Sequence, residues 1–214
     1  MISKSMMLKP LAAAALLAVA AASQAAVTVY TSQASFLAAV SGVGVDTYAG
    51  FSITGSTPSP ITRNAGAYGY TASVSTTSFF GAGTTANPWL STNTATDTIT
   101  YTSFTGGANA VGGNFFGSDI SGQFAAGDIT VTATDASGTT TQTIIAATTT
   151  SFLGFTSTSG ITTLTVAAVQ PSGSFLWPTV DNFTMAVAVP EAQTYAMMLA
   201  GLGVLGFVAR RRRG

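Results

Sequence analysis

The sequence predicts an all-β fold, an antiparallel β-sandwich with jelly-roll or other Greek-key connections. Stretches of alternating polar and apolar residues recur about every ten residues between positions 27 and 189. Glycine, aspartate or serine stands at the breaks between them, as expected of turns. Runs with the periodicity of a helix are almost absent from this body, which is rich in threonine, serine, valine and phenylalanine.

An N-terminal secretory signal peptide is expected at residues 1–25. Two lysines fall in the first nine residues, an apolar stretch follows at 11–22, and small residues precede the expected cleavage point. The apolar stretch is too short to span a bilayer permanently. We therefore predict cleavage by signal peptidase after Ala25, with Ala26 as the second choice, and export of the chain that follows.

One helical turn is predicted ahead of most of the strands, in the segment SQASFLAAV at 32–40. Ser32 is a suitable N-cap residue, because its hydroxyl can accept a hydrogen bond from a free backbone N–H of the first turn. Phe36, Leu37 and Val40 fall on one side of such a helix, and we expect this side to face the core.

The strand pattern is clearest in the segment GDITVTATD at 127–135, where Ile129, Val131 and Ala133 alternate with threonines. Such alternation places apolar side chains on one face of a strand and hydroxyls on the other. The turn residues DASG at 135–138 then close a hairpin onto the next strand. The eight predicted strands lie within 27–31, 97–104, 109–119, 127–135, 138–147, 151–157, 160–169 and 180–189.

The abundance of threonine in these strands allows two interpretations. A β-branched residue fits an exposed pleated face, so the threonines first of all favour strand formation. Regularly spaced hydroxyls also suit glycan contacts, O-glycosylation, or an ordered-water array of the kind that ice-binding faces use. No strict sequence repeat supports the last of these.

The body predicted at 26–188 is acidic. Arg63 is its single basic residue against six aspartates, which leaves a net charge of about −5. Nucleic acid is therefore excluded as a partner, because surfaces that bind nucleic acid are basic. The chain has no cysteine, so its stability depends on packing and hydrogen bonds rather than on disulfides.

The composition also argues against catalysis. The chain has no histidine and no cysteine, which excludes His-based general-base chemistry, thiol nucleophiles and the common zinc sites. Glu191, the one glutamate, lies in the C-terminal segment. Glycoside hydrolysis requires two facing carboxylates, whereas Asp97, Asp128 and Asp135 stand at turn positions. We therefore expect no enzyme, and a glycoside-active one is only the weaker alternative.

The C-terminal segment has the features of a membrane anchor. Residues 194–209 carry no charge, and at about 1.5 Å per residue a helix of this length is near the short limit for a hydrocarbon core of about 30 Å. Consecutive arginines resist translocation and remain in the cytoplasm. A transmembrane helix at about 194–209 is therefore predicted, with the body outside. The predicted stop consists of Arg210, Arg211, Arg212 and Arg213.

The order of these features resembles one known family. Val189, Pro190 and Glu191 precede the apolar run, the run contains the stretch YAMMLAGLG, and the arginine cluster follows. This segment, 189–214, resembles the PEP-CTERM sorting signal, although Ala192 stands where the usual Pro-Glu-Pro has its second proline. In that family the signal belongs to exported proteins of exopolysaccharide-producing Gram-negative bacteria, and an exosortase, a membrane protease or transpeptidase, processes it.

The resemblance implies an exosortase-like partner and two successive locations. The precursor is expected in the inner membrane, with its body facing the periplasm. The processed protein is expected at the cell surface or in the extracellular matrix. A structural or adhesive role in an exopolysaccharide or biofilm matrix is then the expected function.

A carbohydrate-binding, lectin-like module is the alternative function. The segments 110–122 and 177–187 resemble segments that recur in proteins with this sorting signal, whose bodies resemble carbohydrate-binding jelly rolls. A sugar site requires an exposed aromatic ring with polar groups nearby, although large aromatic side chains more often serve packing. The candidates are Trp89, Trp177, Tyr68 and Tyr70, with Asn87 and Asn182 beside them.

No cofactor is expected, and calcium is the one open alternative. Ca²⁺ prefers carboxylate and carbonyl oxygens, so Asp181, Asp119 and Asp46 are the candidate ligands. Neither an EF-hand pattern nor a nonapeptide repeat accompanies them.

Overall fold

The computed structural model describes the chain from residue 27 to residue 189, except residue 77, together with a few residues further on. The latter are 199, 201–203, 205 and 210–211. The predicted signal peptide at 1–25 and most of the predicted span at 194–209 lie outside the described residues. Within the described part of the chain, no helix has the length and apolar character needed to cross a membrane.

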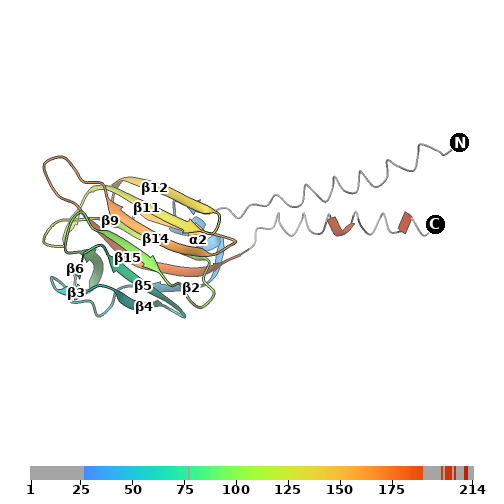
Figure 1. The fold of residues 1–214 in the computed structure, drawn as a ribbon, viewed down its shortest axis with the longest axis horizontal. Coiled ribbons are helices and arrows are strands. Elements are labelled where there is room, and N and C mark those ends of the chain that lie inside the picture. The colour runs from blue at the N-terminus through green and yellow to red at the C-terminus, as the bar shows by residue number, and fades with distance from the viewer. Residues whose placement is uncertain are drawn as a thin grey trace.

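Two antiparallel sheets pack against each other around a shared core (Figure 1), which confirms the predicted all-β class. The first sheet has the order β1 (Thr28–Tyr30), β13 (Phe152–Thr156), β9 (Ala110–Ser118), β15 (Trp177–Ala188), β7 (Asn87–Thr92), β6 (Ser78–Thr84) and β3 (Ser56–Pro58). Two further strands join it, namely β10 (Phe124–Ala125) beside β9 and β2 (Val40–Asp46) beside β15. The second sheet has the order β12 (Gly138–Ala147), β11 (Gly127–Asp135), β14 (Ile161–Ala168), β8 (Thr98–Thr102), β5 (Tyr68–Val74) and β4 (Ile61–Ala65). The jelly-roll or Greek-key type stays a prediction.

Each of the eight predicted stretches coincides with a strand, namely β1, β8, β9 and β11 to β15, although β15 begins at Trp177, ahead of the predicted 180. The hairpin is confirmed as well, because Asp135 pairs with Gly138 across its turn. Ile129, Val131 and Ala133 are fully buried, as their alternation predicted. The pattern missed β2 to β7 and β10. Glycine or proline lies within β2, β3, β5, β6 and β7, whereas β4 and β10 are only five and two residues long.

Among the described residues from 27 to 189, α2 (Gln33–Ala38) is the one helix, and it begins where the sequence predicts. Ser32 is its N-cap and accepts a hydrogen bond from the backbone N–H of Ser35. Phe36 is fully buried, but Leu37 is 41% exposed, so its predicted place in the core was wrong. The reason is the length of the helix: six residues present only one side chain, Phe36, to the sheet, and the buried Val40 already belongs to β2.

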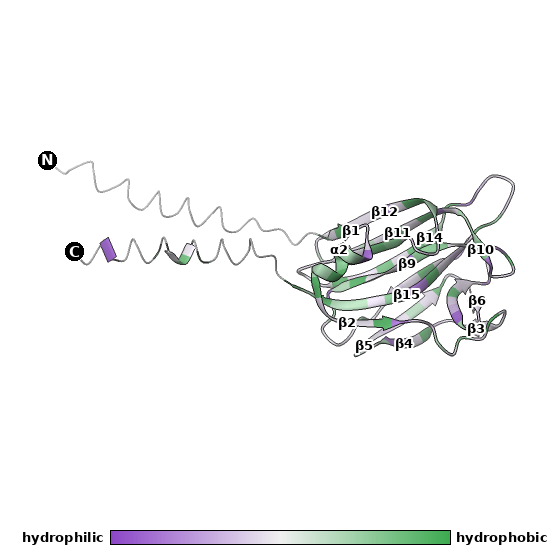
Figure 2. Cartoon of the chain, turned by 180° about the vertical axis from the view of Figure 1, so that it is seen from behind, coloured by the Kyte–Doolittle hydropathy of each residue, from purple (hydrophilic) through white to green (hydrophobic). Residues whose placement is uncertain are grey.

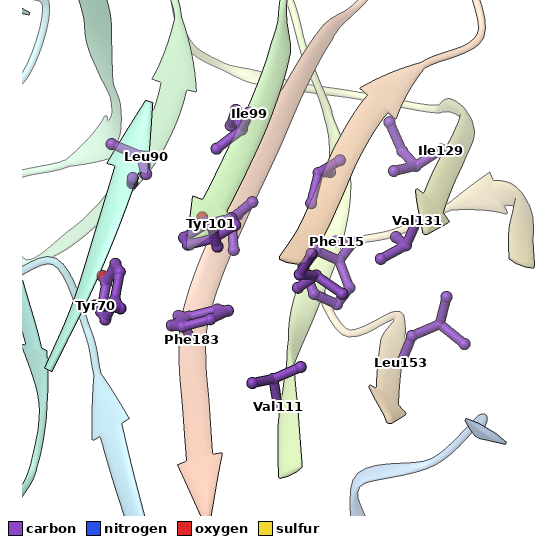
Figure 3. Packing of buried hydrophobic residues seen from close by; sticks show 14 of the residues in the cluster. Tyr70, Leu90, Ile99, Tyr101, Val111, Phe115, Ile129, Val131, Leu153 and Phe183 are labelled. Carbon is purple, nitrogen blue, oxygen red and sulfur yellow. The ribbon is translucent and has the colours of Figure 1, made fainter. Parts of the chain in front are cut away.

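Aromatic side chains from both sheets meet in the core (Figure 3). The rings of Tyr101 on β8 and Phe183 on β15 stack with their centroids 4.3 Å apart. Tyr70 on β5 lies at a tilt against Phe183, at 4.8 Å. These contacts join the two sheets through one ring of β15.

Threonine hydroxyls contact each other on the outer face of β11 and β12. Three cross-strand pairs bring their hydroxyl oxygens to between 3.0 and 3.2 Å. The pairs are Thr130 with Thr143, Thr132 with Thr141, and Thr134 with Thr139. Such cross-strand pairs each contribute about 0.2–1 kcal/mol to the stability of a sheet. The contacts favour the interpretation of these threonines as strand-forming residues. Figure 2 shows that strongly hydrophilic residues are few on the strands in general.

Both described ends of the body lie at one end of the first sheet. Thr28 of β1 pairs with Thr156 of β13, and Thr156 pairs in turn with Ala110 of β9. On its other side, Ala110 pairs with Ala186 of β15. Cross-strand partners lie side by side, so the chain enters and leaves the body in the same row of residues.

Candidate functional site

The predicted sorting segment begins where the last strand ends. β15 closes at Ala188, whose backbone N–H donates to the Oδ1 of Asn109 at 2.6 Å. The backbone N–H of Val189 donates to the carbonyl oxygen of Ala39 at 2.9 Å, while its side chain is about half exposed. The body therefore holds the first residue of the segment in a fixed position, at the end of the sheet where β1 also begins.

Four of the other predicted sorting and stop residues lie outside the described residues. They are Pro190, Glu191, Arg212 and Arg213. Arg210 and Arg211 are helical and exposed. The role of Pro190 and Glu191 in recognition, and that of the four arginines as a stop, therefore stay predictions.

A polar network inside the body was missed by the sequence prediction. The Nε and Nη2 of Arg63 on β4 donate to the two carboxylate oxygens of Asp46 on β2, each at 2.7 Å. The hydroxyl of Tyr70 and the backbone N–H of Tyr48 donate to the same carboxylate, at 2.7 and 2.8 Å. The hydroxyls of Tyr48 and Tyr101 are 2.9 Å apart. The one signal in the sequence was that Arg63 is the single base of an acidic body, so that a carboxylate partner was to be expected.

Hydrogen bonding and burial shift the pKa values of Arg63 and of three tyrosines in this network. The hydrogen bonds that Arg63 donates to Asp46 raise the pKa of its guanidinium. Burial raises the pKa of Tyr48, Tyr70 and Tyr101. None of the three tyrosines can act as a base near neutral pH, because their ordinary value is already about 10. The network therefore connects the two sheets, and its three tyrosines stay protonated and uncharged at neutral pH.

Two shallow depressions flank the ring of Phe51. One has a volume of about 240 Å³ and extends to Asn87 and Pro88. The other has a volume of about 270 Å³ and extends to Thr62 and Arg63. Neither is lined by a carboxylate, and the guanidinium in the second is already paired with Asp46.

The four aromatic candidates for glycan contact occupy different environments. Tyr68 and Tyr70 are buried, and their hydroxyls donate to the carbonyl of Gly42 and to Asp46. Trp89 is partly buried, with its ring 4.8 Å from that of Phe116 and its indole nitrogen buried without a partner. Trp177 is partly exposed, and its ring lies 6.2 Å from that of Phe175, which is 67% exposed.

The two asparagine candidates lie beside Asp181. The side-chain amide of Asn87 donates to the carboxylate of Asp181 at 3.4 Å, and that of Asn182 donates to Asn114 at the same distance. The structure thus brings Asn87 and Asp181 together, as neighbours across β7 and β15.

The three aspartates considered for calcium each have separate hydrogen-bond donors. Asp46 is paired with Arg63, and Asp119 accepts the backbone N–H groups of Ser121 and Gln123 in its own loop. Asp181 accepts from Asn182 and Asn87, and burial raises its pKa. Among the described residues, no three acidic, histidine or cysteine side chains gather into a group suited to a metal ion. The structure therefore does not bring the predicted calcium ligands together in one site.

Comparison with known proteins identifies the segment that follows the body. The family model of the PEP-CTERM protein-sorting motif matches residues 188–213. The chain carries a PEP-CTERM sorting motif. No curated protein and no solved structure matches the chain. The match confirms the resemblance expected from Val189, Pro190, Glu191 and the arginine cluster.

The PEP-CTERM motif implies, in general, an exosortase as partner and a secreted surface protein that is processed at the membrane. Its first matched residue is 188, which is also the last residue of β15. The motif thus begins at the boundary of the folded body.

Proposed function

We propose that this protein is an exported surface or extracellular-matrix protein, sorted by an exosortase, with a structural or adhesive role in an exopolysaccharide or biofilm matrix. The observation that carries the proposal is the position of the PEP-CTERM motif. It begins at Ala188, the last residue of β15, two residues after the last core residue of that strand, Ala186. Cleavage after this point removes no strand, so a processed protein would retain both sheets.

The geometry of β15 suits an adhesive body on a tether. This strand runs from Trp177 to Ala188, which at about 3.3 Å per residue is a length of about 36 Å. The sorting motif is attached to one end of the strand, and the exposed ring of Phe175 precedes the other. A tether at one end leaves the opposite end of the body free for contacts in the matrix.

Mass spectrometry of the native protein from inner-membrane, outer-membrane and culture fractions tests the proposal. We expect the external form to begin near Ala26 and to end near Pro190, without the arginine cluster. An external form that retains the complete C-terminal segment would overturn processing by an exosortase. The variant Ala192→Pro, which restores the usual Pro-Glu-Pro, is the matched control, and we expect it to be processed at least as completely.

The contact between Phe175 and Trp177 favours a second candidate, a carbohydrate-binding module. The two rings lie 6.2 Å apart, and Phe175 is largely exposed. Exposed aromatic rings are suited to stack on sugars. If the candidate is correct, Phe175→Ala and Trp177→Ala abolish retention on the native exopolysaccharide, while Thr100→Ala on the central strand β8 does not. Retention that survives both aromatic substitutions rejects this site.

A further inference from the structure

The strand β12 forms an open edge of the second sheet. It spans Gly138–Ala147 and pairs with β11 on one side only. In Figure 1 it is the outermost strand at the top of the body. An edge strand presents a row of unpaired backbone N–H and C=O groups, to which another strand can add.

The other edges of the two sheets carry features that prevent such pairing. β1 and β3 are three residues long, β10 is two residues long, and β3 ends at Pro58. β2 and β4, outer strands of the two different sheets, pack against each other, since a methyl group on Gly44 of β2 would lie 2.0 Å from the carbonyl oxygen of Ala65. The ion pair of Arg63 and Asp46 closes the same edge. Short strands, prolines, charges and covered edges are the usual protections against edge-to-edge association.

β12 has none of these protections over most of its length. Its sequence, GTTTQTIIAA, has no proline and no charge, and its ten residues form a long edge. A bulge lies at its C-terminal end, where the backbone N–H of Ala146 donates to the carboxylate of Asp128. The residues from Thr139 to Ile144 pair one to one with β11 and remain regular.

The threonine contacts indicate which backbone groups are free. In antiparallel pairs the side chains come closest at the pairs that exchange no backbone hydrogen bonds. The hydroxyl contacts of 3.0 to 3.2 Å identify Thr139, Thr141 and Thr143 as residues of such pairs. Their backbone N–H and C=O groups then point away from β11, toward the open edge.

We propose that β12 pairs, antiparallel, with β12 of a second copy of this chain. A two-fold axis at Thr141 places Thr141 opposite its own copy and Thr139 opposite Thr143 of the other copy. The edge is complementary to itself in this register, because both strands are neutral and offer the same alternating donors and acceptors. Two six-stranded sheets then become one continuous sheet.

The pairing fits the proposed matrix role. The biological setting of the pair rests on that proposed function, whereas the pairing itself does not. A two-fold axis normal to the sheet reverses the direction of every strand. The row of Thr28 and Ala186, where the described chain enters and leaves the body, therefore lies at opposite ends of the two copies. Such a pair suits a bridge between two surfaces rather than two neighbours on one membrane.

Sedimentation of the exported full chain in detergent, over a wide range of concentrations, tests the pairing. We expect the wild type to change from one copy to two as the concentration rises. Thr141→Lys and Thr141→Glu should each lose the dimer, because like charges meet at the axis. An equimolar mixture of the two should regain it. Thr100→Lys, on the outer face of the central strand β8, is the matched control and should dimerise as the wild type does.

Amide hydrogen exchange provides a second, residue-specific test. Dimerisation should slow exchange at Thr139, Thr141 and Thr143, and leave Thr140 and Gln142 unchanged, because the latter already pair with β11. A wild type that stays a single copy at all concentrations, or a Thr141→Lys variant that dimerises like the wild type, overturns the proposal. Neither result affects the proposed sorting, which the mass of the external form tests independently.

Discussion

The guanidinium of Arg63 holds the carboxylate of Asp46 through two hydrogen bonds of 2.7 Å, and thereby joins β4 of one sheet to β2 of the other. Asp46 is 5% exposed and Arg63 22%. Arg63 carries the single positive charge of the body. The Cζ of its guanidinium lies 5.4 Å from the ring centroid of Tyr48 and 5.6 Å from that of Phe51. The edge between the two sheets is therefore closed by an ion pair within an aromatic surround.

Removal of the cation should destabilise the body strongly. In Arg63→Met the carboxylate of Asp46 stays buried without its counter-charge, so we expect a loss of about 3 kcal/mol in the free energy of unfolding. The double variant Asp46→Leu/Arg63→Met should lose less than Arg63→Met alone, since it leaves no buried charge. Chemical denaturation followed by circular dichroism measures both. A single variant within about 0.5 kcal/mol of the wild type would contradict a stabilising role for the pair.

A second prediction concerns the close approach of β2 and β4. In Gly44→Ala the new methyl group would lie 2.0 Å from the carbonyl oxygen of Ala65, so the backbone must move. We expect a loss of about 1–3 kcal/mol in the free energy of unfolding. Gly113→Ala on β9 is the matched control, because its methyl group meets its neighbours at 3.4 Å, an ordinary contact. Equal stabilities of the two variants would refute the close packing of this edge.

Asp135 should support stability at neutral pH and lose this effect in acid. Its carboxylate accepts hydrogen bonds from Ser137 and Ser157 and from the backbone N–H of Gly138, and these bonds lower its pKa. A lowered pKa in the folded state stabilises the protein above the ordinary carboxyl value of about 3.9, and this contribution declines as the pH falls below it. We expect Asp135→Asn to cost about 1–3 kcal/mol at pH 7. The difference from the wild type should shrink in denaturation curves measured below pH 4, and a constant difference would speak against this assignment.

Asp181 should behave in the opposite way. Burial raises its pKa, although hydrogen bonds from Asn182 and Asn87 oppose the shift. A raised pKa in the folded state means that stability falls as the pH rises from the ordinary carboxyl value of about 3.9 to the folded-state pKa, and that the full cost remains above it. We therefore expect Asp181→Asn to be at least as stable as the wild type at pH 7, by up to about 1 kcal/mol. This advantage should fall as the pH drops toward 4, and a variant that is less stable than the wild type at pH 7 contradicts the prediction.

The arginine cluster is the subject of the last prediction. Replacement of Arg210 to Arg213 by serine removes the charges that resist translocation, so the C-terminus should pass through the membrane. Protease accessibility of a C-terminal epitope in spheroplasts measures its side. Replacement of the same four residues by lysine keeps the charge and is the control. An all-serine variant that remains in the inner membrane with its C-terminus inside would show that the arginines are not the stop.

Two of the strands that the sequence pattern missed, β2 and β6, contain glycines that allow another segment to approach closely. Gly44 and Gly81 stand where the backbone of another segment approaches, and a methyl group on Gly81 would lie 1.8 Å from the carbonyl oxygen of Ser52. Glycines chosen for close approach interrupt the alternation on which strand prediction depends. Leu37 failed for a different reason, because its helix ends before it presents a second side chain to the core.

The features that depend on near neighbours could be read from the sequence. Alternation placed Ile129 inside and its threonine neighbours outside, the turn residues DASG placed the hairpin at Asp135, and the order of residues identified the PEP-CTERM motif. The contact between Asp46 and Arg63 and the position of β12 at an open edge are visible in the tertiary structure alone. Both depend on the order of strands within the sheets, which is set by pairing between segments far apart in the chain and leaves no local pattern in the sequence.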